Sequence, residues 1–116
     1  MNLVDSWILM WGLTYITASF IKPDLTKSVF NHDVSKLGSA VIMFIVGSTI
    51  LLSLYLNMSL LYVILGFSHS FMAVANFCGV LRWNIPWKNK GLPHLVMAIL
   101  DATSAVCLFN KIEMNS

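Results

Sequence analysis

Charged side chains are scarce in this sequence. Lys, Arg, Asp and Glu account for 10% of its 116 residues, whereas a soluble domain carries about 25%. Residues 37–81 contain none of the four. At about 1.5 Å per residue, that run would make a helix about 67 Å long, about twice the thickness of a bilayer's hydrocarbon core. The scarcity excludes a water-soluble globular surface, and the run predicts two membrane spans joined by a tight turn.

Cysteines and catalytic motifs are also scarce. The two cysteines, Cys78 and Cys107, do not have the spacing of a zinc or iron–sulfur site. They fall about 20 Å apart in predicted membrane depth, so we expect two packed thiols and no disulfide. There is no glycine-rich phosphate loop and no internal repeat, and the net charge of +2 is too small to indicate nucleic acid binding. We therefore expect no enzyme, no cofactor, no metal site and no nucleic acid partner.

Hydrophobic residues make up 58% of the chain and gather in four segments, residues 3–21, 37–56, 59–81 and 93–109. Each segment is about as long as a membrane-spanning helix requires. The connecting segments are too short to build a core of their own. The sequence therefore predicts an all-α polytopic membrane protein: a single integral membrane domain, residues 1–116, with four transmembrane helices in an antiparallel bundle.

The basic residues predict how this bundle is oriented. Six of the seven Lys and Arg residues lie between the first and second segments or between the third and fourth. The turn at residues 57–59 has no charge, and on its side of the membrane there is only Lys111. Because cytoplasmic loops are enriched in Lys and Arg, we expect both basic loops in the cytoplasm and both termini outside. A bacterial inner membrane is the simplest location.

Tryptophans lie near the predicted ends of the spans, where an indole can keep its ring in the acyl boundary and its N–H among headgroups. Near the inner boundary they alternate with basic residues. The expected interface anchors are Trp7, Trp11, Trp83, Trp87, Arg82 and Lys88.

Small residues recur at helical spacing in three of the segments. In lipid, helices associate by close packing and hydrogen bonding, so stripes of small residues favour helix contacts. The expected packing residues are Gly47, Gly66, Ser70, Ala73, Ala98 and Ala105. A bundle this small would bury further faces in a homo-oligomer or a larger membrane complex, with the lipid bilayer as its other partner.

Asp101 lies at the centre of the fourth predicted span. An ionised carboxylate there costs about 3 kcal/mol or more, so we expect it to face the bundle interior and to favour its protonated form. His69 lies at the centre of the third span and therefore at a similar depth. Helical spacing adds Asn76 to the side of His69 and Ser104 to the side of Asp101. These four residues form a predicted polar seam.

Three interpretations of the seam remain open. Its members hydrogen-bond to hold helices together, or His69 and Asp101 relay a proton, or the fourth segment lies in the membrane interface with Asp101 facing water. Two hypotheses for the function correspond to the first two of these interpretations. One hypothesis is a protein that acts by helix–helix association, as an accessory subunit, a pore-forming or holin-like protein or an immunity-type protein. The alternative is a proton-coupled small transporter or channel that uses Asp101 and His69.

Overall fold

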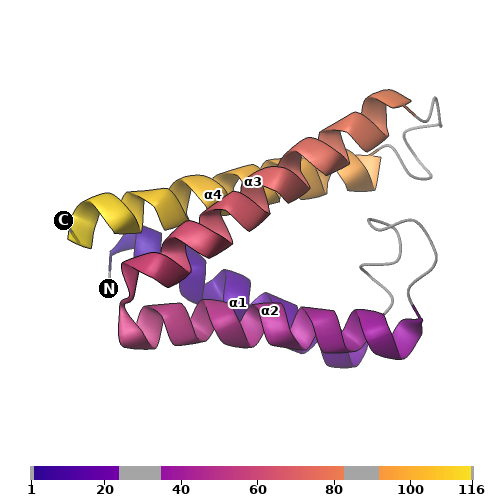
Figure 1. Ribbon diagram of the computed structural model, residues 1–116. Helices are drawn as coiled ribbons and strands as arrows, with labels where there is room; N and C mark the ends of the chain where they lie inside the picture. Colours follow the sequence, from indigo (N-terminus) through magenta and orange to yellow (C-terminus); the bar gives the residue numbers. More distant parts are fainter. Residues whose placement is uncertain (1, 24–34, 83–91, 116) are drawn as a thin grey trace. The chain divides into compact units, whose positions relative to one another are not determined.

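The computed structural model describes residues 2–23, 35–82 and 92–115, and most of these residues lie in helices. The helices are α1 (Leu3–Ile21), α2 (Lys36–Leu56), α3 (Ser59–Arg82) and α4 (Leu92–Asn115) (Figure 1). All four are long and apolar enough to cross a membrane. The prediction of an all-helical chain with four apolar helices is confirmed, and it indicates an integral membrane protein.

The fourth helix extends beyond its predicted end at residue 109. It continues to Asn115, and its apolar part covers Leu95–Met114. The added residues include Lys111, Glu113 and Met114, which have good helix propensity although two of them are charged. Two isolated charged residues within an apolar stretch do not end the helix, so α4 continues past residue 109.

Side chains at the helix ends satisfy backbone groups that helices leave open. The side chain of Asn2 accepts a hydrogen bond from the Asp5 amide at 2.8 Å, and Ser35 accepts one from the Gly38 amide at 3.0 Å. At the end of α2, Asn57 has a φ of 52°, in the left-handed region. Asn tolerates this conformation better than most residues. The chain therefore reverses within two residues, and α3 begins at Ser59. This is the tight turn that the sequence predicted.

The chain divides into two compact units, residues 1–61 and 62–116. In the first unit, α1 and α2 run antiparallel (Figure 1) and approach closely at two glycines. A Cβ on Gly47 would lie 2.7 Å from Cγ1 of Ile16 and 2.8 Å from the carbonyl oxygen of Gly12. A Cβ on Gly12 would lie 2.9 Å from Cδ2 of Leu51. The obstacle at Gly47 includes a backbone atom, whereas the atom nearest to Gly12 is the end of a side chain, so Gly47 sets the closest approach of the two helices.

Aromatic rings line one stripe of α1. The rings of Trp7 and Trp11 stack with centroids 6.2 Å apart, and Tyr15 meets Trp11 edge-on at 5.3 Å. Trp11 is only 8% exposed, on the same buried stripe as Ile8 and Gly12. Positions 7, 11 and 15 repeat at helical spacing, so they share a face. Trp11, which the sequence predicted as an interface anchor near one end of the span, is therefore a buried residue of this stripe.

The second unit begins at Tyr62, within α3. In this unit α4 lies alongside α3 and runs in the opposite direction (Figure 1). A Cβ on Gly66 would lie 2.8 Å from Cε1 of Phe109, whose ring meets Phe67 edge-on at 5.5 Å. Nearer the end of α4, Nζ of Lys111 lies 5.9 Å from the ring centroid of Tyr62. These contacts connect the first half of α3 with the last third of α4.

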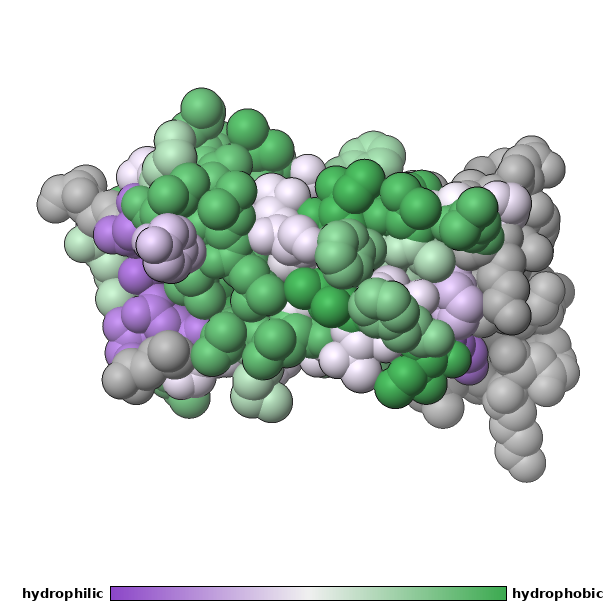
Figure 2. Space-filling model, turned by 90° about the horizontal axis from the view of Figure 1, so that it is seen from below, coloured by the Kyte–Doolittle hydropathy of each residue, from purple (hydrophilic) through white to green (hydrophobic). Residues whose placement is uncertain are grey.

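Large apolar side chains cover the outer faces of the helices. Hydrophobic residues dominate the described part of the face shown in Figure 2. On α3, exposed residues recur at alternating intervals of three and four and form what we call the outer stripe. Its members are Ile64, Phe67, Phe71, Val74 and Cys78. Lipid chains are the environment that accommodates such surfaces.

Candidate functional site

The site is built on the buried face of α4. Asp101 is 1% exposed and lies near the middle of the helix. Ala98 and Ala105 flank it at spacings of three and four, and both are buried. Their small side chains let neighbouring atoms approach the carboxyl group closely. The interfacial alternative requires Asp101 to face water, whereas in this structure its carboxyl group is buried.

Asn76 of α3 is the hydrogen-bonding partner of Asp101. Its Nδ2 donates to Oδ2 of Asp101 at 3.2 Å and to the carbonyl oxygen of Met72 at 2.9 Å. An amide nitrogen carries two hydrogens and both acceptors need one, so the network fixes the orientation of the amide. Asn76 is 1% exposed, so this link between α3 and α4 is shielded.

The other carboxyl oxygen of Asp101, Oδ1, has different surroundings. Oδ1 is buried and has no hydrogen-bond partner among the residues that the structure describes. A buried polar atom without a partner costs about 1–3 kcal/mol. Such atoms are uncommon in native proteins and call for a physical explanation. The two oxygens of one carboxyl group therefore differ sharply in their surroundings.

His69 is also buried, at 3% exposed. Its Nδ1 lies 2.8 Å from the carbonyl oxygen of Leu65. A carbonyl only accepts, so Nδ1 carries a hydrogen, and in the neutral ring Nε2 is then an acceptor. The sequence predicted His69 as the partner of Asp101, whereas the structure gives Asp101 the amide of Asn76, about 10 Å further along α3. Counting residues gives the position of a side chain along its own helix, but it does not give the axial offset between two neighbouring helices.

The serine hydroxyls of this region bond within their own helices. Ser104 donates to the carbonyl oxygen of Leu100 at 2.8 Å, and Ser70 donates to Gly66 at 2.8 Å. Ser104 is 1% exposed, so all four predicted members of the polar seam are buried. Ser70 and Ala73 are only half-buried and lie at the edge of the contact face of α3.

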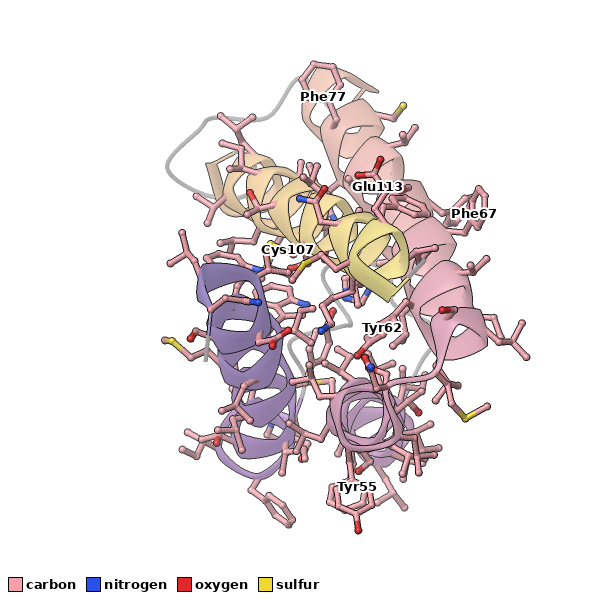
Figure 3. All side chains as sticks on the ribbon, turned by 90° about the vertical axis from the view of Figure 1, so that its left-hand side faces the viewer. Tyr55, Tyr62, Phe67, Phe77, Cys107 and Glu113 are labelled. Atoms are coloured by element: carbon pink, nitrogen blue, oxygen red, sulfur yellow. The ribbon has the colours of Figure 1, made fainter. Side chains whose placement is uncertain are left out.

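Sequence reasoning missed one residue of this region. Lys111 was predicted to lie beyond the membrane end of the fourth span, but it is 8% exposed and its ammonium group lies over the ring of Tyr62, which is fully buried. A lysine at the seventh position after Ser104 shares its helix face, and that spacing was the available signal. Figure 3 shows the contrast with Tyr55, which points away from the helices and is 86% exposed.

The remaining predicted residues fall into two groups. Cys107 is half-buried, but Cys78 is exposed as a member of the outer stripe of α3, so the expectation of two packed thiols is wrong for Cys78. Trp83, Trp87 and Lys88 lie outside the described residues, and Arg82 is the last residue of α3.

The described part of the chain contains no group of three or more His, Cys, Asp or Glu residues that could hold a metal ion. Four membrane-length helices with a buried polar seam define the class as a small integral membrane protein. No protein-family model, no curated protein and no solved structure matches the chain.

Proposed function

We propose that this protein acts by helix–helix association in a membrane, as an accessory subunit, a pore-forming or holin-like protein or an immunity-type protein. The observation that carries the proposal is the outer stripe of α3. Its alternating three- and four-residue spacing is the spacing by which side chains of one helix fit between those of another. Phe67 and Phe71 are 65% and 70% exposed, so two large rings are offered outward. A second copy of the chain, or a helix of a larger complex, is the proposed partner.

The test is co-purification of two differently tagged copies from one membrane. Phe71→Ala removes a ring from the outer stripe, and Phe77→Ala removes one that is also exposed but lies about 120° away around α3. We expect Phe71→Ala to lower the recovery of the second copy and Phe77→Ala to leave it unchanged. Equal effects of the two variants, or a wild-type protein that is monomeric and captures no other membrane protein, would refute the proposal.

The proposal includes an orientation. The basic residues between α1 and α2 and between α3 and α4 support cytoplasmic loops and external termini, in a bacterial inner membrane. Protease treatment of sealed inside-out and right-side-out vesicles tests this with an epitope tag at each end. Tags lost from right-side-out vesicles alone agree with the orientation, and tags lost from inside-out vesicles alone contradict it.

A second candidate function is proton-coupled transport or conduction through Asp101 and His69. The observation that favours it is the buried Oδ1 of Asp101. A carboxyl oxygen without a hydrogen-bond partner can bind and release a proton without first breaking a hydrogen bond. Proton flux into vesicles is the measurement. Asp101→Asn should abolish flux and Asp101→Glu should partly restore it, whereas a packing role predicts that Asn, which still forms hydrogen bonds, preserves function.

A further inference from the structure

Asp101 presents two oxygens in unequal surroundings. Oδ2 accepts a hydrogen bond from Nδ2 of Asn76, while Oδ1 is buried with no hydrogen-bond partner among the described residues. The carboxyl group as a whole is 1% exposed. We propose that Oδ1 of Asp101 is a proton-binding site and that Asn76 is the residue that positions it. This deepens the second candidate function and rests on it for its role, but its test does not require transport.

Burial argues for a bound proton. A charged carboxylate among apolar side chains is far more costly than a neutral polar group. Besides Asp101, two of the described titratable side chains in this unit, Cys78 and Glu113, are exposed; of the other four, Tyr62 and His69 lie on the buried face of α3, and Cys107 and Lys111 lie on α4. None of the four is hydrogen-bonded to Asp101, whose hydrogen bond comes from the neutral amide of Asn76. Among the residues that the structure describes, no cation is therefore hydrogen-bonded to the carboxyl group of Asp101.

Asn76 decides which oxygen takes the proton. Its Nδ2 can only donate, so a hydrogen placed on Oδ2 would oppose the hydrogen that the amide already directs there. The second amide hydrogen is held by the carbonyl oxygen of Met72 at 2.9 Å. Turning the amide over would bring two acceptor oxygens together, so the donor remains directed at Oδ2. Oδ1 is thus the oxygen of the carboxyl group that can take the proton.

The same geometry favours a proton over a metal cation. A sodium or calcium ion requires several oxygen ligands around it. At this carboxyl group Asn76 offers its nitrogen, whose hydrogens repel a cation, and its side-chain oxygen is turned away from Oδ2. A proton requires one oxygen only, and Oδ1 supplies it.

The test is infrared difference spectroscopy of the full chain in vesicles of phosphatidylethanolamine and phosphatidylglycerol, in potassium buffer. The carbonyl band of a protonated carboxyl group that disappears in Asp101→Asn belongs to Asp101. We expect this band in the wild type, and we expect it at higher frequency in Asn76→Leu, because its C=O has lost a hydrogen bond. Ser70→Ala removes a hydroxyl that bonds within α3 and should leave the band in place.

Each outcome decides the proposal. A carboxyl group that shows only carboxylate bands at every pH, or a protonated band that is removed when sodium replaces potassium, overturns the proton site. A band at the same frequency in the wild type and in Asn76→Leu overturns the positioning role. Since Asn76→Leu can disturb folding, dipolar-recoupling NMR of the wild type provides a second measurement: Nδ2 of Asn76 must couple directly to the carboxyl carbon of Asp101. If the band behaves as expected but vesicles show no proton flux, the site stands and the transport function fails.

Discussion

The close approach of α1 and α2 gives a prediction that can be worked out from distances. Replacing Gly47 with Ala adds one methyl group where three atoms already lie within 3.0 Å of it: Cγ1 of Ile16 at 2.7 Å, the carbonyl oxygen of Gly12 at 2.8 Å and Cβ of Tyr15 at 2.9 Å. The carbonyl oxygen belongs to the backbone, and the Tyr15 atom lies at the root of its side chain. Neither can rotate away, so the two helices must move apart.

Two opposing effects set the magnitude. Overfilling a packed interior costs about 1–3 kcal/mol, and a backbone obstacle places this variant in the upper part of that range. Alanine also favours a helix over glycine by about 1 kcal/mol. We expect Gly47→Ala to lower the free energy of unfolding by about 1–2 kcal/mol. A loss of 1.4 kcal/mol is a tenfold change in the folding equilibrium.

The matched control is Gly66→Ala. Its added methyl group would lie 2.8 Å and 2.9 Å from Cε1 and Cζ of Phe109, the far edge of a ring that turns about two side-chain bonds. The ring can yield, so the gain in helix propensity offsets the cost, and we expect stability within about 1 kcal/mol of the wild type. Unfolding by sodium dodecyl sulfate in lipid–detergent bicelles, followed by circular dichroism, measures both. Gly47→Ala at least as stable as Gly66→Ala would refute the close helix contact.

Three further predictions test the second unit. Asn76→Leu removes the hydrogen-bond donor to Oδ2 of Asp101, so that neither carboxyl oxygen has a described partner, and it should lower stability by about 1–2 kcal/mol in the same unfolding assay; no loss would contradict the link between α3 and α4. A membrane-permeant maleimide should label Cys78, which is exposed, faster than Cys107, which is half-buried; mass spectrometry of the two peptides gives the rates, and the reverse order would place the outer stripe elsewhere. Lys111→Met keeps the length of the side chain but removes its cation–π contact, for an expected loss of about 0.5–2 kcal/mol; unchanged unfolding would show that the ring contact contributes nothing.

Hydropathy was sufficient to predict the helices, because a segment that crosses lipid must be both apolar and helical. It was also sufficient for the turn after α2, where the run without charge is too long for one helix and Asn57 accepts a left-handed conformation. The continuation of α4 to Asn115 was missed because the predicted span stopped before the charged residues Lys111 and Glu113, whereas the apolar stretch Leu95–Met114 includes both. These successes and this failure concern single helices, whose properties are local in sequence.

Contacts between helices were predictable only in part. Gly47 was identified from small-residue spacing, but its counterpart Gly12 was not, although a glycine inside an apolar segment was the available signal. The buried face of α4 followed from the spacing of Ala98, Asp101 and Ala105. The partner of Asp101 did not follow, because the offset between two antiparallel helices depends on which side chains interlock. The bulk of Phe109 against Gly66 contributes to that offset.

The two proposed functions draw on different faces of the same helix. On α3, Phe67 and Phe71 point outward, while His69 and Asn76 are buried. A partner helix on the outer stripe would therefore contact α3 without replacing any hydrogen bond of Asp101. Association would still act on the seam, because holding α3 in place fixes the 3.2 Å contact that orients the carboxyl group. If both proposals hold, Phe71→Ala should change the carbonyl band of Asp101 while leaving its protonation intact. A band that is insensitive to Phe71→Ala would mean that the two faces of α3 act independently.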